Sequence, residues 1–80
     1  MGWAELKLHE RIRLVRKAKG ISQTRVAEQV GMTVSSYNMK ELGKRPISTD
    51  ELEGIAGALG ENVSFFYEDN FHVKWNGELA

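Results

Sequence analysis

The sequence predicts an all-α protein, a compact bundle of five helices followed by a short extended arm or strand. Apolar residues recur at intervals of three and four through most of the chain, which is typical of amphipathic helices. A glycine follows each of the first four apolar segments, where left-handed backbone commonly ends a helix. A side chain suited to N-capping precedes four of the segments, namely Ser22, Thr33, Ser48 and Asn62.

The first helix is expected within residues 5–19. Leu8, Ile12 and Val15 supply its apolar stripe, and Gly20 ends it. The remaining surface of this helix is basic, with Arg11, Arg13, Arg16 and Lys17.

The second helix, of about eight residues, begins after the Ser22 cap. Val26, Ala27 and Val30 form its buried side, and Gly31 ends it.

The third helix follows almost at once, capped by Thr33 and closed by Gly43, with Tyr37 as its inward-facing residue. Residues 44–47 form a loop, because Pro46 disfavours a helical conformation at the residue before it.

The fourth helix begins at a capping box formed by Ser48 and Glu51 and ends at Gly60. Its apolar stripe is Leu52, Ile55, Ala56 and Leu59. Asn62 caps a short fifth helix that runs to about Tyr67.

The C-terminal residues change to a period of two, with Phe71, Val73 and Trp75 on one side. A lone strand needs a partner. The tail is therefore a strand paired across a dimer, an arm packed on the helices, or partly disordered. We divide the chain into a domain over residues 1–69 and a tail over residues 70–80, a possible dimerisation strand.

Charge is divided along the chain although the formal net charge is zero. Residues 1–45 hold ten lysines and arginines against four acids, whereas residues 46–80 hold one lysine against seven acids. The halves therefore carry +6 and −6. A basic half that faces phosphates is the arrangement that electrostatic binding of nucleic acid requires, and chance clustering on solvated helices is the simpler alternative.

The residue inventory argues against an enzyme. There is no cysteine, no glycine-rich phosphate loop and no nucleophile beside clustered acids, and His9 is expected on the polar side of its helix. We predict no catalytic residue, no metal and no cofactor.

No apolar run approaches the roughly 20 residues that span a membrane, so we expect a soluble, cytoplasmic protein.

The second and third helices have the spacing of a helix-turn-helix. Ala27 is the small residue at the close approach, Gly31 makes the turn, and Tyr37 returns an apolar group to the core. An ordinary helical hairpin fits this spacing equally well.

Several separated segments together resemble one known family. They are Arg16–Gln23, Val26–Ala27, Gly43–Ser48 and Ile55–Gly60, in that order. Over residues 8–67 the chain resembles the Cro and phage-repressor helix-turn-helix domains, the XRE family. The resemblance implies a five-helix bundle from a bacterium or phage, a repressor that binds double-stranded DNA as a homodimer on a two-fold operator.

The resemblance also implies two sets of contacts. The exposed side of the third helix reads bases in the major groove, here Thr33, Val34, Ser35, Asn38 and Met39. It also places Gln23 at a phosphate or base contact. The further phosphate contacts are predicted from the residues themselves, because a helix N-terminus offers free backbone donors and cations lie nearby: Ser22, Arg11, Arg16, Lys44 and Arg45. The Asn38 amide can pair bidentately with adenine. Val34 or the methyl group of Thr33 can pack on the methyl group of a thymine.

Four positions depart from the family pattern. Lys40 and Glu61 stand where apolar residues are usual. Leu42 stands at a usually polar position, where it would replace part of the packing lost at Lys40. Arg25 stands where a glutamate would complete a capping box with Ser22. The Lys40 stem would lie along the core with its ammonium in solvent. These departures leave an alternative, a protein-interaction module or antitoxin that binds a protein partner in addition to DNA or instead of it.

The acidic half carries five of the seven aromatic residues between positions 65 and 75. We expect a surface for a second copy or another protein, with a homodimer interface made by Phe65, Tyr67, Phe71, Val73 and Trp75. Alternatively, Phe66 closes the monomer core and Trp75 folds back on it.

Overall fold

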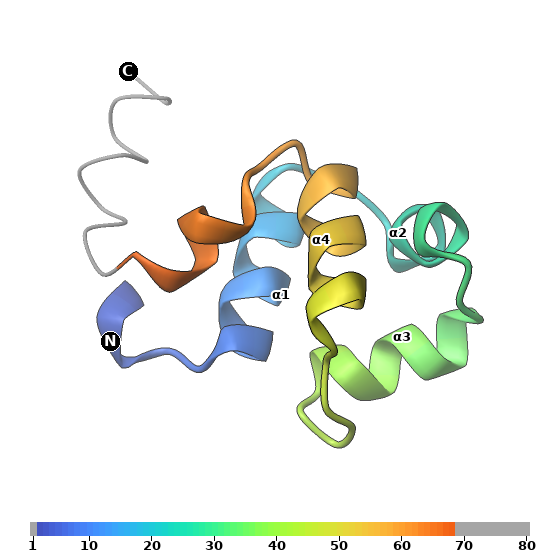
Figure 1. The fold of residues 1–80 in the computed structure, drawn as a ribbon, viewed down its shortest axis with the longest axis horizontal. Coiled ribbons are helices and arrows are strands. Elements are labelled where there is room, and N and C mark those ends of the chain that lie inside the picture. Colours follow the sequence, from blue (N-terminus) through green and yellow to red (C-terminus); the bar gives the residue numbers. More distant parts are fainter. Residues whose placement is uncertain (1, 69–80) are drawn as a thin grey trace.

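A computed structural model describes residues 2–68, in which all regular secondary structure is helical (Figure 1). The elements in order are η1 (Trp3–Glu5), α1 (Leu8–Ala18), α2 (Gln23–Val30), α3 (Val34–Glu41), α4 (Thr49–Ala58) and η2 (Val63–Tyr67), where η marks a 3₁₀ helix. The all-α prediction is confirmed for this part of the chain. The count of five α-helices is not, because the predicted fifth helix is the 3₁₀ segment η2 and another 3₁₀ segment precedes α1. The arm or strand predicted over residues 70–80 lies outside the described residues.

The helices α2, α3 and α4 begin where the capping side chains predict, whereas Asn62 precedes η2 without a capping hydrogen bond from its side chain. The hydroxyls of Ser22, Thr33 and Ser48 each accept a hydrogen bond, 3.1 Å long, from the backbone N–H three residues later. The backbone N–H of Ser48 in turn donates to Glu51 at 2.9 Å, which completes the predicted capping box. These bonds satisfy N–H groups that a helix cannot pair internally.

Glycine ends the first four segments as predicted, and two of these glycines also place helices. Gly31 has φ of +74° and turns the chain from α2 into α3. Gly43 has φ of +79°, and a Cβ there would lie 2.5 Å from Nε2 of His9. The left-handed backbone favours glycine here, and any larger residue would also require the His9 imidazole to move.

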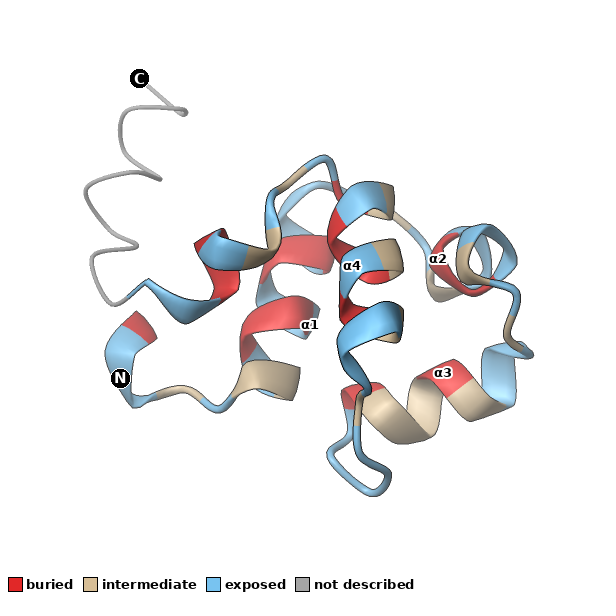
Figure 2. Cartoon of the chain, viewed as in Figure 1, coloured by how far each residue is buried: buried red, intermediate tan, exposed pale blue. Residues whose placement is uncertain are grey.

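The core is formed by apolar residues from all six elements. In Figure 2 the buried stretches of α1, α4 and η2 lie toward the middle of the view, and the loop between α3 and α4 is almost wholly exposed. The core residues are Trp3, Ile12, Val15, Val26, Ala27, Tyr37, Leu52, Ile55, Ala56, Leu59, Phe65 and Phe66. The apolar stripes predicted from spacing supply most of this set.

Trp3 is a core residue that the sequence analysis does not predict. Its ring lies 5.5 Å from that of Phe65 and 6.5 Å from that of Phe66, centroid to centroid. Its indole N–H donates to the carbonyl of Glu68. The segment before α1 therefore covers the end of the core that η2 forms.

This packing corrects one residue of the predicted dimer interface. Phe65 is completely buried within the monomer, so it does not face a partner, whereas Phe66 closes the core as the alternative prediction held. Tyr67, also predicted at the interface, is 62% exposed.

Within residues 2–68, no helix combines the length and the apolar character that crossing a membrane requires.

We expect Trp3→Ala to lower the free energy of unfolding by about 3–5 kcal/mol, because it removes a large buried ring from a small core. Urea unfolding followed by circular dichroism measures the change. Leu14→Ala, at a position 44% exposed on α1, is the control and should change stability by about 0.5 kcal/mol or less. Equal effects of the two substitutions would contradict the placement of Trp3.

Candidate nucleic-acid interface

The arrangement of α2 and α3 is that of a helix-turn-helix. In Figure 1, α2 is seen nearly end-on while α3 runs across the view, and the Gly31 turn joins them. Ala27 and Tyr37 are completely buried between these helices and the rest of the core. Of the three residues singled out from the spacing, Ala27 and Tyr37 thus belong to the core, and Gly31 has the left-handed backbone of the turn.

The outer face of α3 carries the residues predicted to read bases. Thr33, Val34 and Ser35 are exposed at its N-terminal end, and Asn38 and Met39, further along, are half-buried. Thr33, Ser35 and Met39 share a polar cavity of about 210 Å³ with Ser36 and Arg45. Asn38 does not line this cavity.

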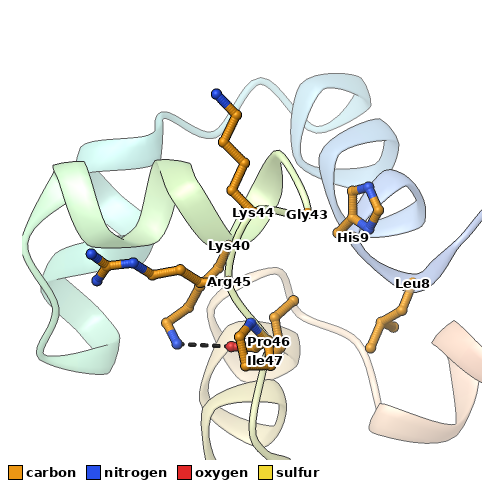
Figure 3. Close-up of a pocket in the computed structure, with 8 residues that line it drawn as sticks. All are labelled: Leu8, His9, Lys40, Gly43, Lys44, Arg45, Pro46 and Ile47. Carbon is orange, nitrogen blue, oxygen red and sulfur yellow. Dashed lines mark hydrogen bonds between the residues drawn. The ribbon is translucent and has the colours of Figure 1, made fainter.

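Polar groups at the start of α2 and cations after α3 flank this face. Ser22 is exposed and Gln23 half-buried at the N-terminus of α2, where the first backbone N–H groups have no partner within the helix. Lys44 and Arg45 are exposed in the loop after α3. Figure 3 shows their side chains extending in different directions from the backbone, beside the pocket that His9 and Ile47 help to line.

Arg11, predicted as a phosphate contact, is instead buried, with 7% of its surface exposed. Its guanidinium lies 4.9 Å from the centroid of the Trp3 ring. Nη1 donates to the carbonyl of Phe66 at 2.7 Å, and Nε donates to that of Leu6 at 3.2 Å. Arg11 therefore joins η1, α1 and η2 rather than facing a ligand.

Arg16, the other phosphate contact predicted on α1, is also buried, at 8% exposure. Its Nε and Nη2 donate to the two carboxylate oxygens of Glu41, each at 2.8 Å. Nη1 donates to the carbonyl of Ile21 at 2.8 Å. The hydrogen bond to Glu41 raises the pKa of Arg16 further above its ordinary value.

Glu41, the carboxylate that pairs with Arg16, is a residue of this site that the sequence analysis does not identify. Burial by itself would raise the pKa of its carboxyl, but hydrogen bonds from Arg16 and Gln23 outweigh burial, and the pKa is lowered. The positions of the two arginines in the sequence do indicate that they are buried. Arg16 stands four residues after Ile12 and Arg11 four before Val15, so both arginines lie on the apolar side of the helix. The exposed cations of α1 are Arg13 and Lys17.

Gln23 links this ion pair to the outer face of α3. Its side-chain NH₂ group donates to Oε1 of Glu41 at 3.1 Å and to Oδ1 of Asn38 at 3.0 Å. A predicted phosphate contact and a predicted base reader therefore lie side by side and are hydrogen-bonded.

The Tyr37 hydroxyl lies beside the same cluster. Among the buried side-chain polar atoms of residues 2–68, it is the one that forms no hydrogen bond of ordinary geometry, although it lies close enough to Glu41 and Arg16 to influence their pKa values. Burial, reinforced by the negative charge of Glu41, raises the pKa of Tyr37. The phenol therefore stays neutral beside the ion pair.

The structure explains two of the four departures from the family pattern, Lys40 and Glu61. The expectation that the Lys40 ammonium lies in solvent is wrong, because it is bonded within the domain. The ammonium of Lys40 donates to the carbonyl of Pro46 and to Glu51, each at 2.9 Å, so it holds the loop to the start of α4 (Figure 3 shows the first bond). Glu61 pairs with Lys19 at 2.9 Å. Leu42 is 41% exposed, so the expectation that it replaces lost packing is wrong.

Comparison with known proteins identifies the class of domain. The sequence profile of the helix-turn-helix family matches residues 12–66. A Sinorhizobium medicae protein, named only as an uncharacterised HTH-type transcriptional regulator, is 34% identical over 65 residues, or 81% of this chain. A Rhizobium meliloti regulator of the same type matches equally well, and one from Sinorhizobium fredii is 32% identical over 63 residues, 79% of this chain.

The chain belongs to the helix-turn-helix family of the XRE type, as the resemblance indicated. It spans slightly less than half the length of these relatives, 47% of the first two and 44% of the third.

We expect Glu41→Gln to destabilise the protein at neutral pH and to flatten the dependence of stability on pH in acid. A carboxyl whose pKa is lowered by folding contributes stability that is complete above its ordinary pKa of 4.5 and is lost as the pH falls toward the folded value. Urea unfolding between pH 3 and pH 7 measures both effects. Loss of stability with the same steepness in the variant would contradict the role of this carboxyl.

A double substitution that removes the charges of both Arg16 and Glu41 is the control for the loss of this carboxylate. Glu41→Leu alone leaves Arg16 buried and unpaired and should cost about 3–5 kcal/mol, whereas Arg16→Met with Glu41→Leu should recover most of that loss.

Proposed function

We propose that this chain is a sequence-specific DNA-binding transcriptional regulator. The observation that supports it best is a helix-turn-helix in which the outer face of α3 is exposed, while the apolar side chains of α2 and α3 are buried in the core. The names of the relatives, HTH-type transcriptional regulators, agree with this proposal. We propose in addition that it acts as a repressor, as the family resemblance implies.

The phosphate contacts come from two regions beside α3. Free backbone N–H groups at the start of α2, by Ser22 and Gln23, suit an anionic oxygen. Lys44 and Arg45 supply exposed charge in the loop after α3, and Arg45 lines a cavity with Thr33, Ser35 and Met39. We leave Arg11 and Arg16 out of this set because their guanidinium groups are already bonded within the domain.

The base contacts come from the exposed face of α3. Val34, 40% exposed, is an apolar group suited to a thymine methyl, and Ser35 has both a donor and an acceptor for base edges. Thr33, Asn38 and Met39 complete the set. It has no arginine, so we expect recognition to depend on methyl contacts and short polar side chains.

We further propose that the protein binds its operator as a homodimer. Two recognition helices about 34 Å apart would then read successive turns of the major groove. Tyr67 provides an exposed aromatic side chain where the described chain ends. Phe71, Val73 and Trp75, the other residues predicted at the interface, lie outside the described residues, and whether this acidic half binds another protein stays a prediction.

Selection of bound duplexes from a random pool tests DNA binding. We expect a selectable sequence whose log affinity falls steeply with log salt concentration, with a slope of about −0.9 for each phosphate contact. Lys44→Gln should weaken all duplexes alike and reduce the slope by about one contact. Lys19→Gln is the control, because Lys19 is bonded to Leu59 and Glu61 at the far end of α4. Binding without sequence preference or salt dependence would refute the proposal.

Deletion of residues 70–80 tests the dimer. We expect sedimentation equilibrium to show a dimer for the full chain and a monomer for the deletion variant, because the period-two aromatic segment is removed. The Phe65 and Phe66 core should keep the shortened chain folded. Deletion of residues 78–80 alone is the control. An unchanged mass for the longer deletion would contradict the predicted interface.

A further inference from the structure

We propose that Glu41 and Gln23 fix the side-chain amide orientation of Asn38, so that α3 presents a hydrogen-bond donor that favours guanine over adenine at one position. The inference rests on the proposed DNA-binding function and adds a positioning role for two residues that need not touch a base. It differs from the adenine pairing that the sequence analysis predicts for Asn38.

The first step is the fixed ionisation of Glu41. Both carboxylate oxygens accept hydrogen bonds from Arg16, each at 2.8 Å, and the Glu41 side chain is 1% exposed. An ionised carboxylate has acceptors only. Any further polar neighbour of Glu41 must therefore turn a donor toward it.

The second step is the orientation of Gln23. An amide can place either its oxygen or its NH₂ group toward a neighbour, but an oxygen 3.1 Å from Oε1 of Glu41 would put two acceptors together. The NH₂ group must therefore occupy that position. Its second hydrogen is then available to the neighbouring amide of Asn38.

The third step is the orientation of Asn38. Because Gln23 offers a donor 3.0 Å away, the Asn38 side chain turns Oδ1 toward α2. Its own NH₂ group then points away from Gln23. The bidentate pairing of asparagine with adenine needs the oxygen and the NH₂ group on the base together.

The consequence for recognition follows from the base edges. Guanine presents two acceptors in the major groove, O6 and N7, whereas adenine presents one acceptor and one donor. An NH₂ group without its oxygen matches the guanine edge and leaves the adenine N6 donor without a partner. The relay from Glu41 through Gln23 therefore changes the base that Asn38 prefers.

A second consequence concerns Gln23. Both hydrogens of its side-chain NH₂ group are engaged, so the side chain has no donor left for a phosphate. The phosphate contact at the start of α2 must then come from the backbone N–H groups, where a helix N-terminus offers them.

The test compares base preference in the full chain with that of Gln23→Met, which keeps the length of the side chain and removes its donors. We expect duplex selection to show guanine at one position for the unaltered protein. In Gln23→Met the ratio of guanine to adenine at that position should fall about fivefold or more, with preferences elsewhere unchanged. Gln29→Met, at an exposed position on the same helix, should leave all preferences unchanged. Helical circular dichroism confirms that both variants are folded.

The outcomes separate the two proposals. If the unaltered protein binds no duplex in a salt-dependent manner, the proposed function fails. If it binds a selected duplex but Gln23→Met leaves the guanine preference in place, or if the unaltered protein selects adenine there, the relay is wrong and the function stands. Amide exchange in the free protein gives an independent readout. The side-chain NH₂ protons of Gln23 should exchange with solvent more slowly than those of Gln29, and equal rates would also overturn the relay.

Discussion

The buried ion pair between Arg16 and Glu41 is the interaction on which the arrangement of the first three helices depends. Arg16 uses three donors, two for the carboxylate at the end of α3 and one for the Ile21 carbonyl just before α2. Gln23 adds a bond from α2 to the same carboxylate. A charge taken out of water is tolerated only when it is paired and hydrogen-bonded. The pair therefore restricts how α1 and α3 can lie relative to each other. It thereby also restricts the position of the turn between α2 and α3.

A second arginine has a comparable role at the other end of α1. Arg11 bonds backbone carbonyls before the helix and in η2 while its guanidinium stacks on Trp3. The two cations that look most suited to a polyanion thus hold the fold together. Positive charge available to a ligand comes from other positions, chiefly the loop after α3 and the exposed side of α1.

The helix boundaries were predictable because caps and left-handed glycines are local signals. Ser22, Thr33 and Ser48 bond within three residues of themselves, so no tertiary information is needed. The role of Arg16 depends on a partner 25 residues away, and a count of charges cannot separate a paired cation from a free one. Trp3 lies in a 3₁₀ helix of only three residues, which is too short to show a periodic apolar pattern. The link between Gln23 and Asn38 requires the geometry of two helices at once.

The outer face of α3 combines positions under different constraints. Val34 and Ser35 are exposed, and neither belongs to the core cluster or to the hydrogen-bond relay. Asn38 is bonded to the cluster that positions the helices. Mutation during evolution can therefore exchange the first two for new side chains at little cost in stability. Under the proposed function, such exchanges would change the DNA sequence that the domain prefers. A change at Asn38 would alter the environment of a buried ion pair at the same time. New target preferences should accordingly arise first at the N-terminal end of this helix.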